Sequence, residues 1–175
     1  MKINRTLEDY TIAMSGAPLQ LNLGCGRRNA PTSYGIDILD VAGVDVVCDL
    51  LEGIPLPDNS FDTILAIDFL EHTPQGVANI RIMEEIYRVL KVGGTFYFSV
   101  PSTDGNNVGA FQDPTHLSFW NIMKFHYFMA DKYGQGFRSL YDIKSFFAPV
   151  NIYTINNAAG ITYVEGSLTK EALND

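Results

Sequence analysis

The amino-acid sequence predicts an α/β fold whose central sheet is mostly parallel. Residues 19–23 alternate apolar and polar side chains and stop at Gly24 and Gly26, a pattern typical of a buried strand that ends in a sharp turn. A second short apolar run, 34–38, carries a carboxylate, Asp37, near its end. α/β proteins use such a strand, glycine turn and acid-ending strand to hold a nucleoside, with the ribose hydroxyls at the acid.

The composition favours a single domain over residues 1–175 and argues against two kinds of partner. The chain is 46% hydrophobic, which is enough to bury a core. It has 12 basic and 20 acidic residues, a net charge of −8 and no basic run, so we do not expect nucleic acid as a partner. No apolar run approaches the roughly 20 residues that cross a bilayer, so no membrane span is expected.

The cysteines and the N-terminus predict a cytoplasmic protein. Cys25 and Cys48 lie in apolar surroundings at the ends of predicted strands, which is typical of reduced thiols rather than of a disulfide framework. Residues 1–9 are largely polar and do not form the apolar core of a signal peptide. The oligomeric state has no signature in the sequence.

The N-terminal half reads as strands joined by short connections. A short helix is expected over 6–14, within an N-terminal extension 1–18. The connection 24–34 is only about ten residues long and contains a proline, so the first crossover helix is reduced to a single turn around 27–30. The further strands expected in this half are 44–48 and 61–67.

The second half opens with the clearest helix, 73–91, which Thr73 would cap and two glycines would end. A strand over 95–100 leads into a long loop, 101–118, and loops of this length are commonly binding loops. An aromatic-rich helix is expected over 119–131, with its aromatic side chains in the core. Two β-like stretches, 138–147 and 161–168, predict an antiparallel C-terminal strand pair.

Several segments in series resemble the class I S-adenosylmethionine-dependent methyltransferases, which have a Rossmann-like sheet. Together they cover about residues 19–101, and an ordered series is far more specific than a lone Gly-x-Gly. The sequence departs from the common pattern at Asn22, where many members have an acid, and in the missing crossover helix. The matching segments are Leu-Asn-Leu-Gly-Cys-Gly at 21–26, Gly-Ile-Asp at 35–37, Asp-Leu at 49–50, Leu-Pro-Asp-Asn-Ser-Phe-Asp at 56–62, Phe-Leu-Glu-His at 69–72 and Glu-Glu-Ile-Tyr-Arg-Val-Leu-Lys-Val-Gly-Gly at 84–94.

The resemblance implies S-adenosyl-L-methionine as the cofactor and assigns its contacts along the chain. The backbone of the glycine turn would approach the methionine end, Asp37 would bind the ribose hydroxyls and Ile38 would pack on the adenine. Asp49 and Leu50 would meet the adenine edge, and Asp68 would lie where α/β ligands bind, at the carboxyl edge of the sheet. The expected cofactor-binding residues are therefore Gly24, Cys25, Gly26, Asp37, Ile38, Asp49, Leu50 and Asp68.

The candidate catalytic residues lie in the long loop, which we interpret as the active-site loop. Asp113-Pro114-Thr115-His116 resembles a segment of some bacterial and phage-type members of this family. We expect His116 to act as a base or substrate binder and Asp113 to orient its imidazole, a recurrent use of a carboxylate. Glu71 and His72 are a weaker acid–base candidate because adjacent residues point apart. A metal site formed by His72, His116 and nearby acids stays an open alternative, but no ligand spacing supports it, so none is expected.

These observations predict a methyltransferase acting on a small-molecule or sugar-like acceptor, which the sequence does not identify. Three alternatives remain: a non-catalytic cofactor-binding protein, another group transfer from the same sulfonium, and a dinucleotide-dependent oxidoreductase. The oxidoreductase is disfavoured because the turn after Gly26 lacks a third glycine and leaves little room for the helix that would meet a pyrophosphate.

Overall fold

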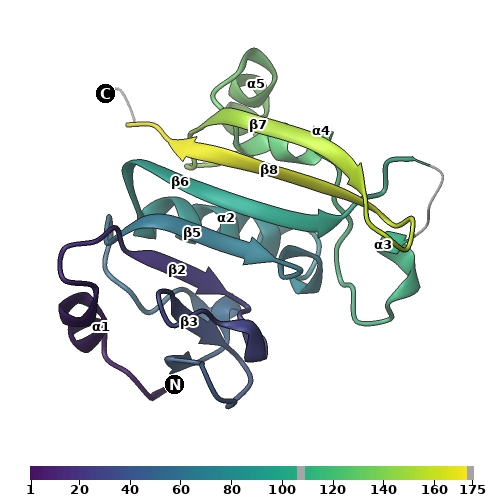
Figure 1. Ribbon diagram of the computed structural model, residues 1–175. Helices are drawn as coiled ribbons and strands as arrows, with labels where there is room; N and C mark the ends of the chain where they lie inside the picture. The colour runs from purple at the N-terminus through teal and green to yellow at the C-terminus, as the bar shows by residue number, and fades with distance from the viewer. Residues whose placement is uncertain (106–108, 173–175) are drawn as a thin grey trace.

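The computed structural model describes residues 1–105 and 109–172, which form one eight-stranded mixed sheet with helices packed against it (Figure 1). The strand order is β1-β4-β3-β2-β5-β6-β8-β7. The strands are β1 (Lys2–Ile3), β2 (Gln20–Leu23), β3 (Tyr34–Asp37), β4 (Val46–Val47), β5 (Phe61–Ile67), β6 (Leu90–Pro101), β7 (Phe147–Asn156) and β8 (Thr162–Lys170).

The centre of the sheet is parallel, as the sequence predicts. Pairs β3–β4, β2–β3, β2–β5 and β5–β6 run parallel, and β8 and β7 add an antiparallel end. The two-residue β1, which the sequence does not predict, pairs antiparallel with β4. Because the central strands share one direction, their carboxyl ends lie along one edge of the sheet, on the right in Figure 1.

The N-terminal helix and the reduced first connection are confirmed. Helix α1 (Leu7–Met14) begins after Thr6, whose side chain accepts a hydrogen bond from the Asp9 amide. Its buried Tyr10 hydroxyl donates to two backbone carbonyls and the ring packs on Tyr34, so α1 is fixed to the sheet. The first connection holds only the 3₁₀ turn η1 (Gly26–Arg28).

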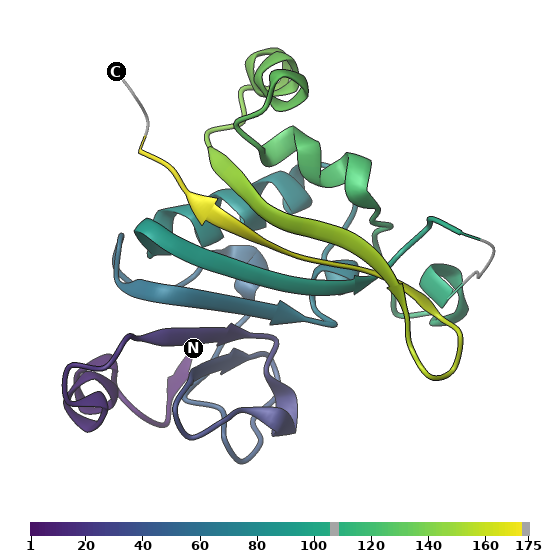
Figure 2. The ribbon, with the colours of Figure 1, turned by 45° about the horizontal axis from the view of Figure 1, so that its top comes forward.

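Helix α2 (Val77–Val89) starts four residues later than the sequence predicts. The Thr73 hydroxyl does not cap α2; it donates to the Leu70 carbonyl and closes the preceding turn η3 (Leu70–His72). The helix then ends directly into β6, so the two glycines expected to stop it lie within the strand. Figure 2 shows α2 packed along one face of the sheet, beside β5 and β6.

The C-terminal half contains more helix than predicted. The expected helix 119–131 is shorter than predicted: α4 (Ile122–Phe125) leads directly into η4 (His126–Phe128), which ends because Met129 is extended and bridges to Phe147. Its aromatic side chains Trp120, Phe125 and Phe128 are buried in the core as predicted, whereas Phe119 is 40% exposed. The strand predicted over 138–147 is wrong for most of its length. Helix α5 (Lys132–Tyr141) covers the start of this stretch, and β7 begins only at Phe147.

The long loop 101–118 is partly ordered by a short helix, α3 (Gly109–Gln112). Residues 106–108 of the expected active-site loop lie outside the described residues. Helix α3 lies at the carboxyl edge of the sheet beside the β7–β8 hairpin in both Figure 1 and Figure 2. Among residues 1–105 and 109–172, no helix has the length and apolar character needed to cross a bilayer.

Candidate functional site

A cavity of about 680 Å³ lies at the carboxyl ends of β2, β3, β4 and β5, and its size suits a nucleoside-bearing ligand. Seven of the eight predicted cofactor residues line it. They are Gly24, Gly26, Asp37, Ile38, Asp49, Leu50 and Asp68. The parallel strands bring together residues that lie up to 44 positions apart in the sequence, from Gly24 to Asp68.

The glycine turn forms one wall of this cavity. Gly24 and Gly26 both have positive φ, at 64° and 49°, a conformation that glycine adopts without steric cost. A Cβ atom on Gly24 would lie 2.6 Å from the Phe69 ring, whereas one on Gly26 would meet no atom within 4 Å. The turn therefore packs against Phe69 on one side and leaves open space next to the backbone of Gly26.

This difference predicts unequal costs for two matched substitutions. Gly24→Ala should lower the free energy of unfolding by roughly 2–3 kcal/mol, because it combines left-handed strain with a clash. Gly26→Ala should cost only about 1 kcal/mol, because it carries the backbone strain alone. Urea unfolding of both variants without ligand measures the difference. Equal losses would contradict the close packing of Gly24 on Phe69.

Asp37, the last residue of β3, connects this strand to the glycine turn through a hydrogen bond. One carboxylate oxygen accepts from the Gly26 amide at 2.7 Å and the other accepts from the Leu39 amide at 2.8 Å. The residue is only 7% exposed, yet it lines the cavity. Each carboxylate oxygen has a second lone pair, so Asp37 can still accept from ligand hydroxyls.

Asp49 and Leu50 lie at the far side of the same cavity. The Asp49 side chain accepts from the Leu51 amide at 2.9 Å and caps the 3₁₀ turn η2 (Leu50–Glu52). Near it, Ile38, Leu39 and Leu51 are 66%, 56% and 44% exposed. Large apolar side chains exposed around a cavity favour a planar apolar group such as a nucleobase as its occupant.

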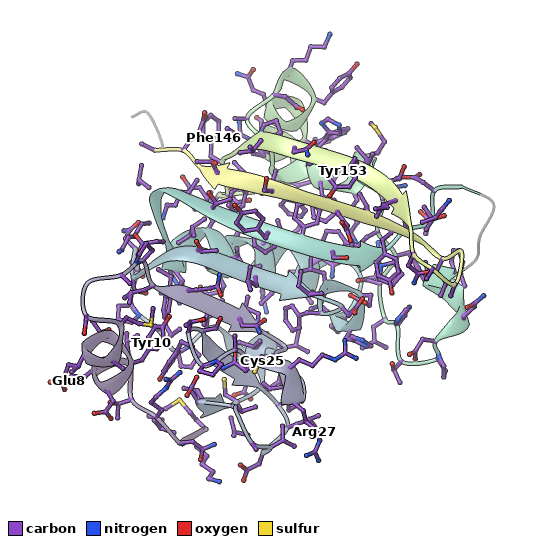
Figure 3. The ribbon with its side chains drawn as sticks, viewed as in Figure 1. Glu8, Tyr10, Cys25, Arg27, Phe146 and Tyr153 are labelled. Carbon is purple, nitrogen blue, oxygen red and sulfur yellow. The ribbon has the colours of Figure 1, made fainter. Side chains whose placement is uncertain are left out.

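Cys25 is the one predicted cofactor residue that does not line the cavity. Its side chain is buried inside the molecule and its sulfur lies beside Gly35, where a Cβ atom would come within 2.7 Å of it (Figure 3). Burial, with Asp37 nearby, raises the pKa of this thiol to about 12. Arg27, two residues on, extends away from the molecule in the same view. Cys25 therefore packs beneath the glycine turn and supports its backbone conformation, and it does not form part of the cavity wall.

A second cavity of about 320 Å³ adjoins the first and shares Asp68 and His72 with it. Asp68 directly follows β5 and has φ of 50°, an uncommon conformation that is best tolerated by aspartate and asparagine. The second cavity is lined mainly by η3, α3 and the loop after it, with Glu71, Asp113 and His116 among its residues. It therefore joins the carboxyl edge of the sheet to the long loop.

Hydrogen bonds hold the long loop against η3. The Glu71 carbonyl accepts from the amides of Leu117 and Ser118, at 2.7 and 3.0 Å. The ring centroids of His72 and His116 lie 5.2 Å apart. Burial raises the pKa of the Glu71 carboxyl to about 8, and the negative charges of Asp68 and Asp113 add to this effect.

The expected pairing of Asp113 with the His116 ring is corrected by these contacts. His116 Nδ1 donates instead to the Ala110 carbonyl, at 2.9 Å. Asp113 accepts from both the amide and the hydroxyl of Thr115, at 2.8 and 2.6 Å, and these bonds lower its pKa. Asp-Pro-Thr is a turn signature in which the aspartate bonds the backbone two residues on, and that local preference prevails.

Sequence reasoning did not find several cavity residues. Phe69, Leu39 and Leu51 are apolar and read as core from sequence, although the strand ends direct them to the cavity. Thr73 and Thr115 come from two loops that meet only in the fold. A separate hollow of about 710 Å³ between η2 and α2 contains neither the glycine turn nor a histidine, so we do not interpret it as the nucleoside site.

Comparisons with known proteins find a family match and distant relatives for part of the chain. Residues 21–98 match the family described as "Methyltransferase domain". A curated relative, cycloartenol-C-24-methyltransferase of Arabidopsis thaliana, is 38% identical over 77 residues. That match covers 42% of this chain but only 22% of the relative. The family match over residues 21–98 ends before the long loop, so it includes the glycine turn and Asp37 but neither Asp113 nor His116.

Solved structures show the same fold over nearly the whole chain. One is a Burkholderia thailandensis 1,6-didemethyltoxoflavin-N1-methyltransferase with bound S-adenosylhomocysteine, at a TM-score of 0.62 and 19% identity, covering 93% of this chain and 76% of that one. Another is the [4+2]-cyclase SpnF, at a TM-score of 0.61 and 17% identity, covering 93% and 80%. The fold is therefore the Rossmann-like fold of class I methyltransferases, as predicted, and the expected cofactor agrees with the family match.

Proposed function

We propose that this chain, which carries a methyltransferase domain over residues 21–98, transfers a methyl group from S-adenosylmethionine to a small polar acceptor. The observation that supports this most directly is the pair of adjoining cavities at the carboxyl edge of the sheet. The larger one carries the glycine turn and Asp37. The smaller one carries the acid–imidazole cluster, and the two meet at Asp68 and His72.

In this proposal the larger cavity holds the methyl donor along its full length. Asp37 accepts from the ribose hydroxyls, and the open space at Gly26 admits the methionine end. Ile38 covers the adenine, whose edge meets Asp49 and Leu50. The sulfonium then lies toward Asp68, where the two cavities meet.

The smaller cavity holds the acceptor. An acceptor oxygen or nitrogen attacks the methyl carbon, the carbon–sulfur bond breaks with its electrons moving to sulfur, and the acceptor's proton passes to His116. Alignment of the reacting atoms supplies most of the acceleration, because the sulfonium is already activated. Asp68 and Asp113 make this cavity acidic, so neutral or cationic acceptors, including sugar-like ones, fit it better than anionic ones.

Asp113 acts as a positioning residue in this scheme. It holds Thr115, and the Thr115 carbonyl accepts from His72 Nδ1 at 3.2 Å. The turn formed by Asp113 and Thr115 therefore fixes both imidazoles of the smaller cavity. His116 is fixed because it directly follows this turn, and His72 because its Nδ1 donates to the Thr115 carbonyl. We also propose that residues 1–175 form a single functional domain and that the protein is cytoplasmic.

Substitution of His116, the proposed base, distinguishes a role in catalysis from a role in cofactor binding. His116→Ala should lower the rate of methyl transfer roughly 100-fold, the range that loss of a general base gives. It should change the affinity for S-adenosylmethionine less than twofold, because His116 does not line the larger cavity. Turnover assays and titration calorimetry measure the two quantities. An equal loss of both would make His116 a structural or cofactor-binding residue.

The test of the function itself is formation of S-adenosylhomocysteine from S-adenosylmethionine in the presence of a library of small acceptors. Product that depends on an acceptor supports methyl transfer. Cofactor binding without any acceptor-dependent product supports the non-catalytic alternative. The non-catalytic alternative has to be tested because a shared fold does not determine the reaction, and the [4+2]-cyclase SpnF has the same fold as this chain.

A further inference from the structure

Three side chains of the smaller cavity form a compact set of metal-ligating groups. Glu71, His72 and His116 each offer one ligand atom, and these three atoms lie within 4.8 Å of one another. Glu71 and His72 come from η3, and His116 comes from the loop after α3. Hydrogen bonds from the Leu117 and Ser118 amides to the Glu71 carbonyl hold that loop against η3 and help to bring the set together.

Both histidines have the ring orientation found in metal sites. His116 Nδ1 faces the Ala110 carbonyl and His72 Nδ1 faces the Thr115 carbonyl. A carbonyl oxygen only accepts hydrogen bonds, so both Nδ1 atoms carry the proton when the rings are neutral. This tautomer leaves a lone pair on each Nε2, the nitrogen available to a metal ion. Metal-ligating histidines usually donate their other nitrogen to a carbonyl or carboxylate in this way.

One carboxyl oxygen of Glu71, the acid of this set, has no hydrogen-bond partner among the described residues. Glu71 is 2% exposed, and its Oε2 atom has no hydrogen-bond partner among residues 1–105 and 109–172. A buried carboxylate oxygen without a partner is costly and calls for a cation or donor not drawn from the described chain. Asp68 and Asp113 line the same cavity and make it more favourable for positive charge.

We propose that Glu71, His72 and His116 bind one divalent transition-metal ion at the boundary of the two cavities. Two imidazole nitrogens and one carboxylate oxygen favour zinc, cobalt, iron or manganese over magnesium or calcium. Ligand atoms of one such ion lie roughly 3–4 Å apart at bond lengths of about 2.0–2.2 Å, so small side-chain rotations close the site. The sequence predicts no metal site because these residues show no ligand spacing.

The proposed ion rests on the proposed function and deepens it, because Glu71, His72 and His116 all line the acceptor cavity. Three protein ligands with open positions is the arrangement of catalytic rather than structural metal sites. His116 can accept a proton only when no ion is bound. With the ion in place, the metal replaces the imidazole as the group that faces the acceptor.

Titration of the metal-free protein with Co²⁺, without S-adenosylmethionine, tests this site independently of methyl transfer. Visible absorption reports the ligand field and calorimetry gives the stoichiometry. We expect one ion per chain with a dissociation constant in the micromolar range or below, and at least 100-fold weaker binding in both His72→Ala and His116→Ala. Glu71→Gln should weaken binding at least tenfold, since loss of a ligand or its charge has effects of this size.

The chain offers matched controls for this titration. His126 is the third histidine, pairs with Asp131 and lies outside both cavities, so His126→Ala should bind Co²⁺ normally. Cys48→Ser should also bind normally, which excludes a thiolate site at the cavity wall. Circular dichroism confirms that each variant is folded. Absence of Co²⁺ binding by the parent protein, or binding in His72→Ala and His116→Ala as tight as in the parent, would overturn the proposal while leaving the cofactor assignment intact.

Discussion

Replacement of Asp37 by alanine is expected to weaken the binding of S-adenosylmethionine more than tenfold. Asp37 is the only acid of β3, and its buried carboxylate lines the larger cavity. Hydrogen bonds to a charged acceptor contribute roughly 1.5–3 kcal/mol, which corresponds to about a 10- to 150-fold change in affinity. The substitution also frees the Gly26 amide from its 2.7 Å hydrogen bond, which loosens the glycine turn. Titration calorimetry measures the affinity directly.

Asp40 provides the matched control for this substitution. It lies three residues further along the chain, its side chain is 55% exposed, and it pairs with Lys2 outside the cavity. Asp40→Ala removes the same charge from a position outside the cavity, so it should leave the affinity for S-adenosylmethionine unchanged. If Asp37→Ala bound the cofactor as well as Asp40→Ala does, Asp37 would not be the ribose ligand.

Replacement of Trp120 by alanine should lower the free energy of unfolding by roughly 3–5 kcal/mol, the range for large aromatic side chains in cores. Trp120 is fully buried and packs on Phe125, with ring centroids 4.9 Å apart. Its Nε1 atom donates to the Ser118 hydroxyl and to the Leu70 carbonyl, at 2.9 and 3.2 Å. The alanine variant therefore loses packing and the indole hydrogen-bond donor, whereas the Leu70 carbonyl still accepts from the Thr73 and Ser118 hydroxyls.

Two further variants separate these contributions in chemical denaturation. Trp120→Phe keeps most of the packing and removes the donor, so it should lose about 1–2 kcal/mol. Leu140→Ala truncates an apolar side chain that is 72% exposed and should stay within about 0.5 kcal/mol of the parent. A Trp120→Ala loss as small as that of Leu140→Ala would show that the aromatic cluster is not part of the cooperative core.

Local sequence signals predict the parallel half of the fold well. The strand expected over 61–67 is observed as β5 with the same bounds, because its apolar run is bounded by turn residues. The glycine turn and Asp37 are readable because backbone conformation and strand-end position are local properties. Seven of the predicted cofactor residues consequently line one cavity.

Tertiary contacts decide what the sequence could not predict. Thr73 has the signature of a helix cap, but its hydroxyl closes η3 instead, and α2 begins only at Val77. The stretch after residue 131 is rich in β-favouring aromatics, yet the Asp131 cap and the stacking of Phe137 on Tyr127 stabilise α5. The Glu71–His72–His116 cluster depends on contacts between two loops far apart in sequence, so no spacing rule could indicate it.

The central claim is that the cavity at the glycine turn holds the methyl donor, and a crystal structure of the protein soaked with S-adenosylhomocysteine tests it most directly. The account predicts the ribose hydroxyls at Asp37, the adenine against Ile38, and the sulfur directed toward Asp68 and the smaller cavity. Ligand bound between η2 and α2, or with its sulfur directed away from His72 and His116, would contradict it.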